Sequence, residues 1–143
     1  MFIGEYQHQI DEKRRLAIPA KFRKELGKTA IITRGLDNCL FLFTRDEWGK
    51  LVKRLGELPI GQSDARAFVR LMLAGAMEVT LDTLGRILVP EYLKTYALLR
   101  KKIVLAGISS RIEIWDEMYW NRYKKRTEKK VGNMAERLSQ LGI

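Results

Sequence analysis

The sequence predicts an α+β protein in which two copies of one unit, related by a pseudo-twofold axis, close into a small β-barrel with flanking helices. A ten-residue pattern occurs twice, at residues 10–19 and 81–90, and both copies read apolar residue, Asp, three variable residues, Arg, three apolar residues, Pro. Short apolar or alternating segments follow each copy, as expected of strands. Because one unit of about 40 residues is too small to bury its own core, the two copies are expected to pair.

The first unit contains four predicted strands, and they lie at residues 2–10, 16–18, 30–33 and 40–43. The polar residues 11–14 predict a hairpin turn between the first two strands. Pro19 suits the first position of a short helix, which Gly27 ends. Thr44 and Glu47 form a capping box that opens an amphipathic helix reaching Leu58.

A second helix over residues 63–73 is predicted to link the units, after which the order of elements begins again. The second unit has strands at residues 77–81, 87–89, 103–105 and 111–115, with a short helix after Pro90. A last helix opens at Asp116 and runs into a basic segment. The predicted boundaries are 1–56 for the first repeat, 57–76 for the linking helix, 77–123 for the second repeat and 124–143 for a basic C-terminal helix and tail, all within one integrated barrel.

Positive charge is the strongest compositional feature of the chain. It has 143 residues, with 27 Lys and Arg against 17 Asp and Glu, and a net charge of +10. The excess lies in residues 1–56 and 121–143, whereas the middle of the chain is neutral. Such a distribution attracts polyanions, so nucleic acid is the first expected partner and an anionic membrane surface the second. A role in solubility alone is the third interpretation.

A cytoplasmic protein is expected from the lack of secretion and membrane features. The chain has one cysteine, Cys39, so it has no internal disulfide. The N-terminal residues contain no basic leader, and no apolar stretch reaches the roughly 18 residues of a membrane span. No membrane-spanning segment is therefore predicted, and with nucleic acid as the first expected partner we expect no membrane partner.

Few residues favour catalysis. The only histidine, His8, falls on a predicted strand, and Cys39 precedes one and is expected to behave as a small hydrophobic residue. The chain has no phosphate-binding glycine loop and no spacing typical of metal ligands. We therefore expect no enzymatic activity, no cofactor, no metal and no small-molecule substrate.

The repeated turns hold the candidate DNA-binding residues, which are Lys13, Arg14 and Arg15 in the first copy and Arg86 in the second. A guanidinium group suits both phosphate oxygens and the O6 and N7 edge of guanine, and Arg15 is the strongest single candidate. The second turn carries less charge, so we expect the two copies to be used unequally.

A structural interpretation stands beside the DNA-binding one. Asp11 and Asp82 can each cap a turn and pair with the arginine four residues later. The cationic residues 124–130 are a second candidate for DNA contact, although such a run is more often a solvated helix face.

The paired motifs, ending at Pro19 and Pro90, and the loop Arg34-Gly-Leu-Asp-Asn-Cys-Leu40 resemble the MraZ family from Met1 to Asn121. The resemblance implies a swapped-hairpin, double-psi-like β-barrel of two SpoVT-AbrB repeats. It also implies a nucleoid-associated regulator that binds short direct repeats in double-stranded DNA, at the promoter of its own division and cell-wall gene cluster. Assembly into a ring is implied too, with eight subunits as the expected number.

The first motif departs from the family pattern, in which glycine commonly precedes the arginine, as Gly85 does in the second. This chain has Arg14 at that position. If the turn requires a positive φ, Arg14 carries a cost of about 1 kcal/mol that Gly85 does not. The alternative to DNA binding is a non-enzymatic, ring-forming assembly or adaptor protein, in which the positive charge serves solubility or acidic partners.

Overall fold

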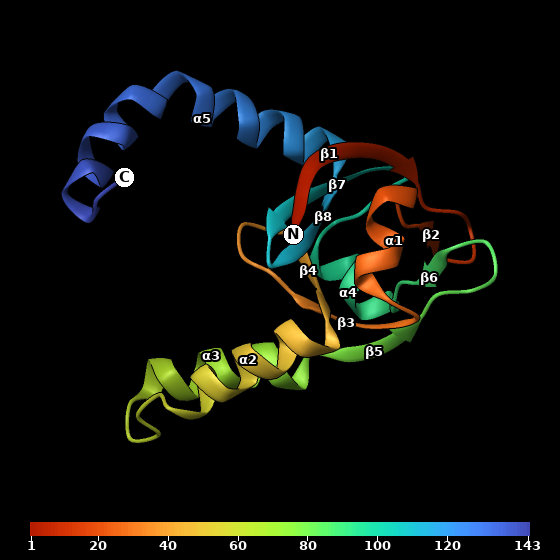
Figure 1. Ribbon diagram of the computed structural model, residues 1–143, viewed down its shortest axis with the longest axis horizontal. Helices are drawn as coiled ribbons and strands as arrows, with labels where there is room; N and C mark the ends of the chain where they lie inside the picture. Colours follow the sequence, from red (N-terminus) through yellow and green to blue (C-terminus); the bar gives the residue numbers. More distant parts are fainter.

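The computed structural model describes all residues of the chain, 1–143, and shows an α+β fold with antiparallel strand pairing throughout (Figure 1). The first repeat contains β1 (Phe2–Gln9), β2 (Arg15–Ala17), α1 (Ala20–Leu26), β3 (Thr29–Arg34), β4 (Leu40–Thr44) and α2 (Arg45–Gly56). α3 (Ser63–Ala74) follows, and the second repeat contains β5 (Met77–Thr80), β6 (Arg86–Leu88), α4 (Glu91–Tyr96), β7 (Lys102–Ser109), β8 (Arg111–Asp116) and α5 (Glu117–Leu138). The predicted α+β class and order of elements are confirmed.

The strands pair mainly between the repeats. A six-stranded sheet has the order β1-β7-β8-β4-β3-β5, and β2 pairs with β6 in a separate two-stranded sheet. The predicted hairpin between the first two strands is wrong, because only a single bridge, Ile10 to Leu16, joins them. The chain does turn there, but β2 is three residues long and its central side chain is buried by pairing with β6 of the other repeat.

The register of two strand pairs reveals a pseudo-twofold axis. Leu16 lies opposite Ile87, the residue at the same position in the second motif. Between β4 and β8, Phe41 lies opposite Glu113, and the two positions are again equivalent in the repeats. Since equivalent residues face each other only at a twofold axis, the axis passes through both pairs. The predicted relation between the repeats is therefore confirmed at the level of strand pairing.

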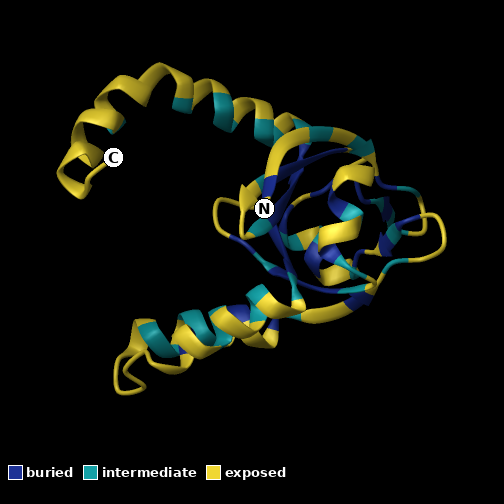
Figure 2. Ribbon diagram, in the orientation of Figure 1, coloured by how far each residue is buried: buried dark blue, intermediate teal, exposed yellow.

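Two apolar clusters hold the fold together. Buried residues gather among the strands, whereas the outer parts of the long helices are mostly exposed (Figure 2). The larger cluster contains Leu16, Ile87 and residues from both sheets and from α1 and α4. The smaller one lies beneath α2, α3 and α5 and includes Phe43, Met72 and Trp115. Each fully buried apolar side chain contributes about 1.5–3 kcal/mol, and every cluster draws on both repeats, so neither repeat has a core of its own.

The helix starts differ in detail from the predictions. Pro19 and Pro90 are the N-cap residues of α1 and α4, one position before the helix, because both have an extended ψ near 140°. In α2 the backbone N–H of Glu47 donates to Thr44 Oγ1 over 3.0 Å, which confirms one half of the capping box. The Glu47 carboxylate instead accepts from Lys50.

The long helices project from the sheets on one side (Figure 1). α2 and α3 form a hairpin, and α5 continues as one 22-residue helix beyond the sheet. None of the helices combines the length and apolar composition that a transmembrane span requires. The two motif turns, before β2 and β6, lie at the opposite edge of the view from these helices.

Candidate nucleic-acid interface

The first turn is organised by the carboxylate of Asp11. Its Oδ1 accepts hydrogen bonds from the backbone N–H groups of Lys13 and Arg15 over 2.9 and 2.8 Å. Its Oδ2 accepts from Arg15 Nε over 2.6 Å. The main chain closes the same turn, because Arg14 N–H donates to the Asp11 carbonyl. Asp11 therefore fixes both the backbone and the arginine side chain.

The second turn repeats this geometry with other side chains at its tip. Asp82 Oδ1 accepts from the N–H groups of Leu84 and Arg86, each over 2.9 Å, and Oδ2 accepts from Arg86 Nε over 2.8 Å. Gly85 N–H donates to the Asp82 carbonyl. The contacts expected of aspartates that cap a turn and pair with an arginine are therefore present in both turns.

Hydrogen bonding holds both carboxylates in the charged form. The backbone N–H of Arg15 is the main cause of a lowered pKa of Asp11, and that of Arg86 is the main cause at Asp82. Burial opposes the shift at both sites, and the paired guanidinium adds to it. Both turns thus carry an ion pair at neutral pH.

Arg15 and Arg86 occupy equivalent places in the two turns, and the same donor groups remain available on each. Each uses Nε for its aspartate, and neither Nη group takes part in a hydrogen bond within the chain. Their side chains are 38% and 28% exposed, respectively. The planar end of each guanidinium is thus oriented by the turn and available to an acceptor outside the protein.

Lys13 and Arg14 differ in how accessible they are. Lys13 is exposed at the tip of the first turn, at the position of Leu84 in the second. Arg14 is half-buried, and its Nε donates to the carbonyl of Val89 over 3.0 Å. Of the three predicted basic residues in this turn, Arg14 is thus the one held by the other repeat.

The structure confirms that both turns require a positive φ at the residue before the arginine. Arg14 has φ 61° and Gly85 has φ 75°. Gly85 also meets Arg23 of α1, because a Cβ at this position would lie 2.3 Å from Arg23 Nε. A side chain at residue 85 would therefore be strained by the backbone conformation and would have to displace Arg23.

Further basic residues, which the sequence analysis missed, lie next to each turn. Arg23 and Lys28 line a shallow groove with Asp82 and Thr83 of the second turn. Lys94, which is equivalent to Arg23, and Arg100 line a groove with Arg14 on the first-turn side, together with Glu12 and Glu91. Only the 71- to 72-residue offset between the repeats, combined with the pairing of β2 and β6, could have indicated these residues. The second turn thus has basic neighbours from outside its own sequence.

The other basic candidate, residues 124–130, lies on α5, away from the turns in Figure 1. Lys124 donates to Glu5 Oε1 over 2.9 Å, and Trp120 Nε1 donates to the other oxygen of that carboxylate. Lys125, Arg126, Lys129 and Lys130 are exposed. This run is a separate surface of the molecule and does not join the turn residues.

Side chains associated with catalysis are dispersed or inert. Burial raises the pKa of the Cys39 thiol, which donates to the Leu36 carbonyl. Burial is also the main cause of a lowered pKa of His8, and the charge of Arg23 acts in the same direction. No three His, Cys, Asp or Glu side chains lie close enough together to bind a metal ion.

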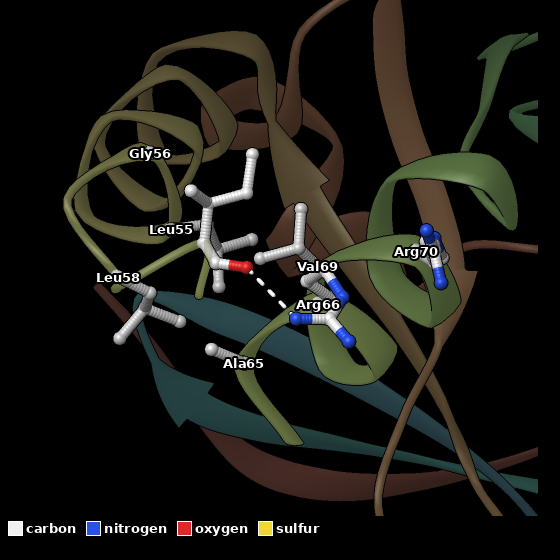
Figure 3. A pocket seen from close by; sticks show the side chains of 8 residues that line it. Leu55, Gly56, Leu58, Ala65, Arg66, Val69 and Arg70 are labelled. Carbon is white, nitrogen blue, oxygen red and sulfur yellow. Dashed lines mark hydrogen bonds between the residues drawn. The ribbon is translucent and has the colours of Figure 1, made fainter. Parts of the chain in front are cut away.

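An apolar groove lies at the far end of the α2–α3 hairpin (Figure 3). Leu55, Leu58 and Val69 line it, and Arg66 donates to the carbonyl of Ile60 over 3.0 Å. The groove contains no acidic or nucleophilic side chain, and it lies away from both motif turns. It is therefore not part of the candidate interface.

The fold and the turns together define a class of protein: a two-repeat α+β protein in which each repeat presents one aspartate-held arginine. Comparison with known proteins is more specific. The family model described as "MraZ protein, putative antitoxin-like" matches the chain twice, over residues 1–71 and 72–141. The chain belongs to the MraZ family.

Relatives that cover the whole chain carry one name. A protein of Desulfitobacterium hafniense is 50% identical over 143 residues, and one of Alkaliphilus oremlandii is 48% identical over 143 residues. One of Caldanaerobacter subterraneus subsp. tengcongensis is 46% identical over the same length. Each alignment covers 100% of both chains, and each relative is named "Transcriptional regulator MraZ".

Proposed function

We propose that this protein is a sequence-specific, double-stranded DNA-binding regulator of transcription. The observation that carries the proposal is the pair of turns in which an aspartate orients an arginine and leaves its Nη groups open. The net charge of +10 supports it, as do the full-length relatives named as transcriptional regulators. Regulation of this kind requires DNA binding and no chemical reaction by the protein.

Base reading is assigned to Arg15, with Lys13 contacting phosphate beside it. An arginine that is fixed through Nε presents a planar fork, which matches the two acceptors of guanine in the major groove. Lys13 is exposed at the same turn and is suited to the backbone as a mobile point charge. Arg86 is assigned a weaker contact, because Leu84 stands where the first turn has Lys13.

Several copies of the turn are needed, because one turn offers few base contacts. We propose a ring of eight subunits that presents its turns to short direct repeats, since linked weak sites gain affinity from effective concentration. The pairing of β1, β2 and β5 with strands of the other repeat supports a swapped-hairpin barrel of the SpoVT-AbrB type as the unit of that ring. Val131 and Leu138 on α5, and Leu141 in the 3-10 turn that follows it, are exposed apolar surface consistent with contacts between subunits.

The proposed target is the promoter of the protein's own division and cell-wall gene cluster, on the nucleoid. Footprinting of the DNA upstream of its own gene tests this, with light scattering to measure the size of the free protein. Protection of two or more short direct repeats by a multimer is the expected result. Uniform, unphased protection, equal to that of a scrambled duplex, would contradict sequence-specific regulation.

Salt titration separates this function from the adaptor alternative. Binding through phosphates lowers log affinity by about 0.9 per contact for each unit of log salt concentration. A steep slope together with preference for the repeat-containing duplex supports the regulator. A shallow slope without preference would favour a ring that binds another protein.

A further inference from the structure

Two buried carbonyl groups at equivalent places in the motifs depend on arginine side chains. Ile18 and Val89 precede the two motif prolines, and both residues are fully buried. The Ile18 carbonyl accepts from Arg23 Nε over 2.8 Å, and the Val89 carbonyl accepts from Arg14 Nε over 3.0 Å. These are the only hydrogen bonds that the two carbonyls accept within the chain. Loss of either arginine would leave a buried acceptor unpaired.

The two carbonyls lie in equivalent surroundings, one in each repeat, but the arginines that donate to them come from different parts of the sequence. Arg14 is in the turn itself, whereas Arg23 is in α1. The backbones match, because Val89 N–H donates to the Arg14 carbonyl and Ile18 N–H donates to the Gly85 carbonyl, over 2.8 and 2.9 Å. The difference therefore lies only in the side chain that closes each site.

The absence of a side chain at Gly85 leaves room for Arg23 beside the second turn. A Cβ at residue 85 would meet Arg23 Nε at 2.3 Å, Arg23 Cζ at 2.4 Å and Arg23 Cδ at 2.8 Å. The guanidinium of Arg23 thus fills the space that a side chain at residue 85 would enter. On the other side of the axis, Arg14 enters the equivalent space from the turn, and Lys94 stands in the position that corresponds to Arg23.

We propose that Arg14 and Arg23 are equivalent positioning residues, each of which donates to the buried carbonyl before a motif proline where the turn of the opposite repeat packs, and that Arg14 does not bind DNA. This inference rests on the proposed function only in assuming that the turns bind DNA. The positioning role itself does not depend on that assumption. It reassigns Arg14, one of the candidate DNA-binding residues, because Arg14 is the only donor within the chain to the buried Val89 carbonyl of the other repeat, whereas Arg15 pairs with the aspartate of its own turn.

Moving the arginine from α1 to the turn tests the equivalence without DNA. Arg23→Ala is expected to lower the midpoint of thermal unfolding by about 4 °C or more. Gly85→Arg alone is expected to lower it as well, because it collides with Arg23. The double variant Arg23→Ala/Gly85→Arg is expected to recover most of the loss, since it copies the first turn. Lys24→Ala, which removes a neighbouring exposed charge from α1, is the control and should leave the midpoint unchanged.

The reverse exchange offers an independent test on the other side of the axis. Arg14→Gly is expected to lower the unfolding midpoint, and Arg14→Gly/Lys94→Arg is expected to restore it by copying the second turn. Additive losses in both double variants would overturn the equivalence. That outcome would leave the proposed function untouched, because no DNA is present in the measurement.

The salt dependence of promoter binding separates a positioning role from a phosphate contact. Arg14→Gly and Arg23→Ala are expected to weaken binding about tenfold without changing the slope of log affinity against log salt, and the double variants are expected to recover affinity. A slope that becomes shallower by about 0.9 in Arg14→Gly would show that Arg14 contacts a phosphate and would overturn its reassignment.

Discussion

Leu16 and Ile87 occupy the same position in the two motifs and lie directly opposite each other in the β2–β6 pair. Leu16 is fully buried and Ile87 is 1% exposed, and both belong to the larger apolar cluster. Because that cluster draws on both repeats, the halves of this protein share one core. Folding of one half is therefore expected to depend on the other.

Truncation at this contact should destabilise the whole molecule at once. Leu16→Ala and Ile87→Ala are each expected to lower the free energy of unfolding by about 2–5 kcal/mol. Trp48 packs on Phe43 of the first repeat, and Trp115 and Trp120 pack on each other in the second. Fluorescence of Trp115→Phe/Trp120→Phe therefore follows the first repeat in denaturant, and that of Trp48→Phe follows the second. Coincident transitions are expected from both probes. Separate transitions would show that the repeats fold independently.

Gly107 should not tolerate a side chain. A Cβ added at this position would lie 2.5 Å from the backbone nitrogen of Ile3 in β1, and a backbone cannot give way as a flexible side chain can. Gly107→Ala is expected to cost about 1–3 kcal/mol in denaturant unfolding. Gly49→Ala is the matched control: Gly49 is in α2, has open space around its Cβ, and should gain up to about 1 kcal/mol.

Acid should release both turns together. The folded pKa values of Asp11 and Asp82 lie below the ordinary value of 3.8, so their stabilising effect is fully present above that pH and is lost as pH falls through the lowered values. Asp11→Asn/Asp82→Asn is therefore expected to be less stable than the parent protein at pH 6 and to approach it near pH 2. Thermal unfolding across this range measures the difference. A constant difference at every pH would mean that the carboxylate charge is irrelevant.

His8 offers a single, resolvable probe of the region beside Arg23. Burial lowers its pKa below 6.5, and the positive charge of Arg23 adds to the effect. Its contribution to stability is therefore complete above pH 6.5 and declines as pH falls through the lowered folded pKa. NMR titration of the only imidazole in the chain should show this value, and Arg23→Ala should raise it. An unchanged pKa in the variant would place Arg23 too far away to act.

Local features of the chain were predictable because they depend on neighbours in sequence. The two motifs, the positive φ at Arg14 and Gly85 and the cap at Thr44 follow from residue type and short spacing. The strands and helices follow from apolar periodicity for the same reason.

Contacts between the repeats were not predictable from periodicity. The sequence before β2 is typical of a hairpin turn. In the structure β2 pairs instead with β6, because this pairing buries the Leu16 side chain fully against the other repeat. The approach of Arg23 to Gly85 is likewise a tertiary contact across the axis, and no signal within α1 indicates it. The turn residues of the candidate site could therefore be predicted from the sequence, whereas the residues that pack against the turns could not.

The most direct test of the central claim is the affinity of Arg15→Ala for the duplex upstream of the protein's own gene, measured beside Lys24→Ala. Both variants lose one positive charge. Of the two residues replaced, Arg15 presents free Nη groups from a motif turn and Lys24 does not. The expected result is a loss of at least about tenfold for Arg15→Ala, with an unchanged oligomer by light scattering and no loss for Lys24→Ala. Equal affinity of the two variants would contradict DNA recognition by the aspartate-held arginine.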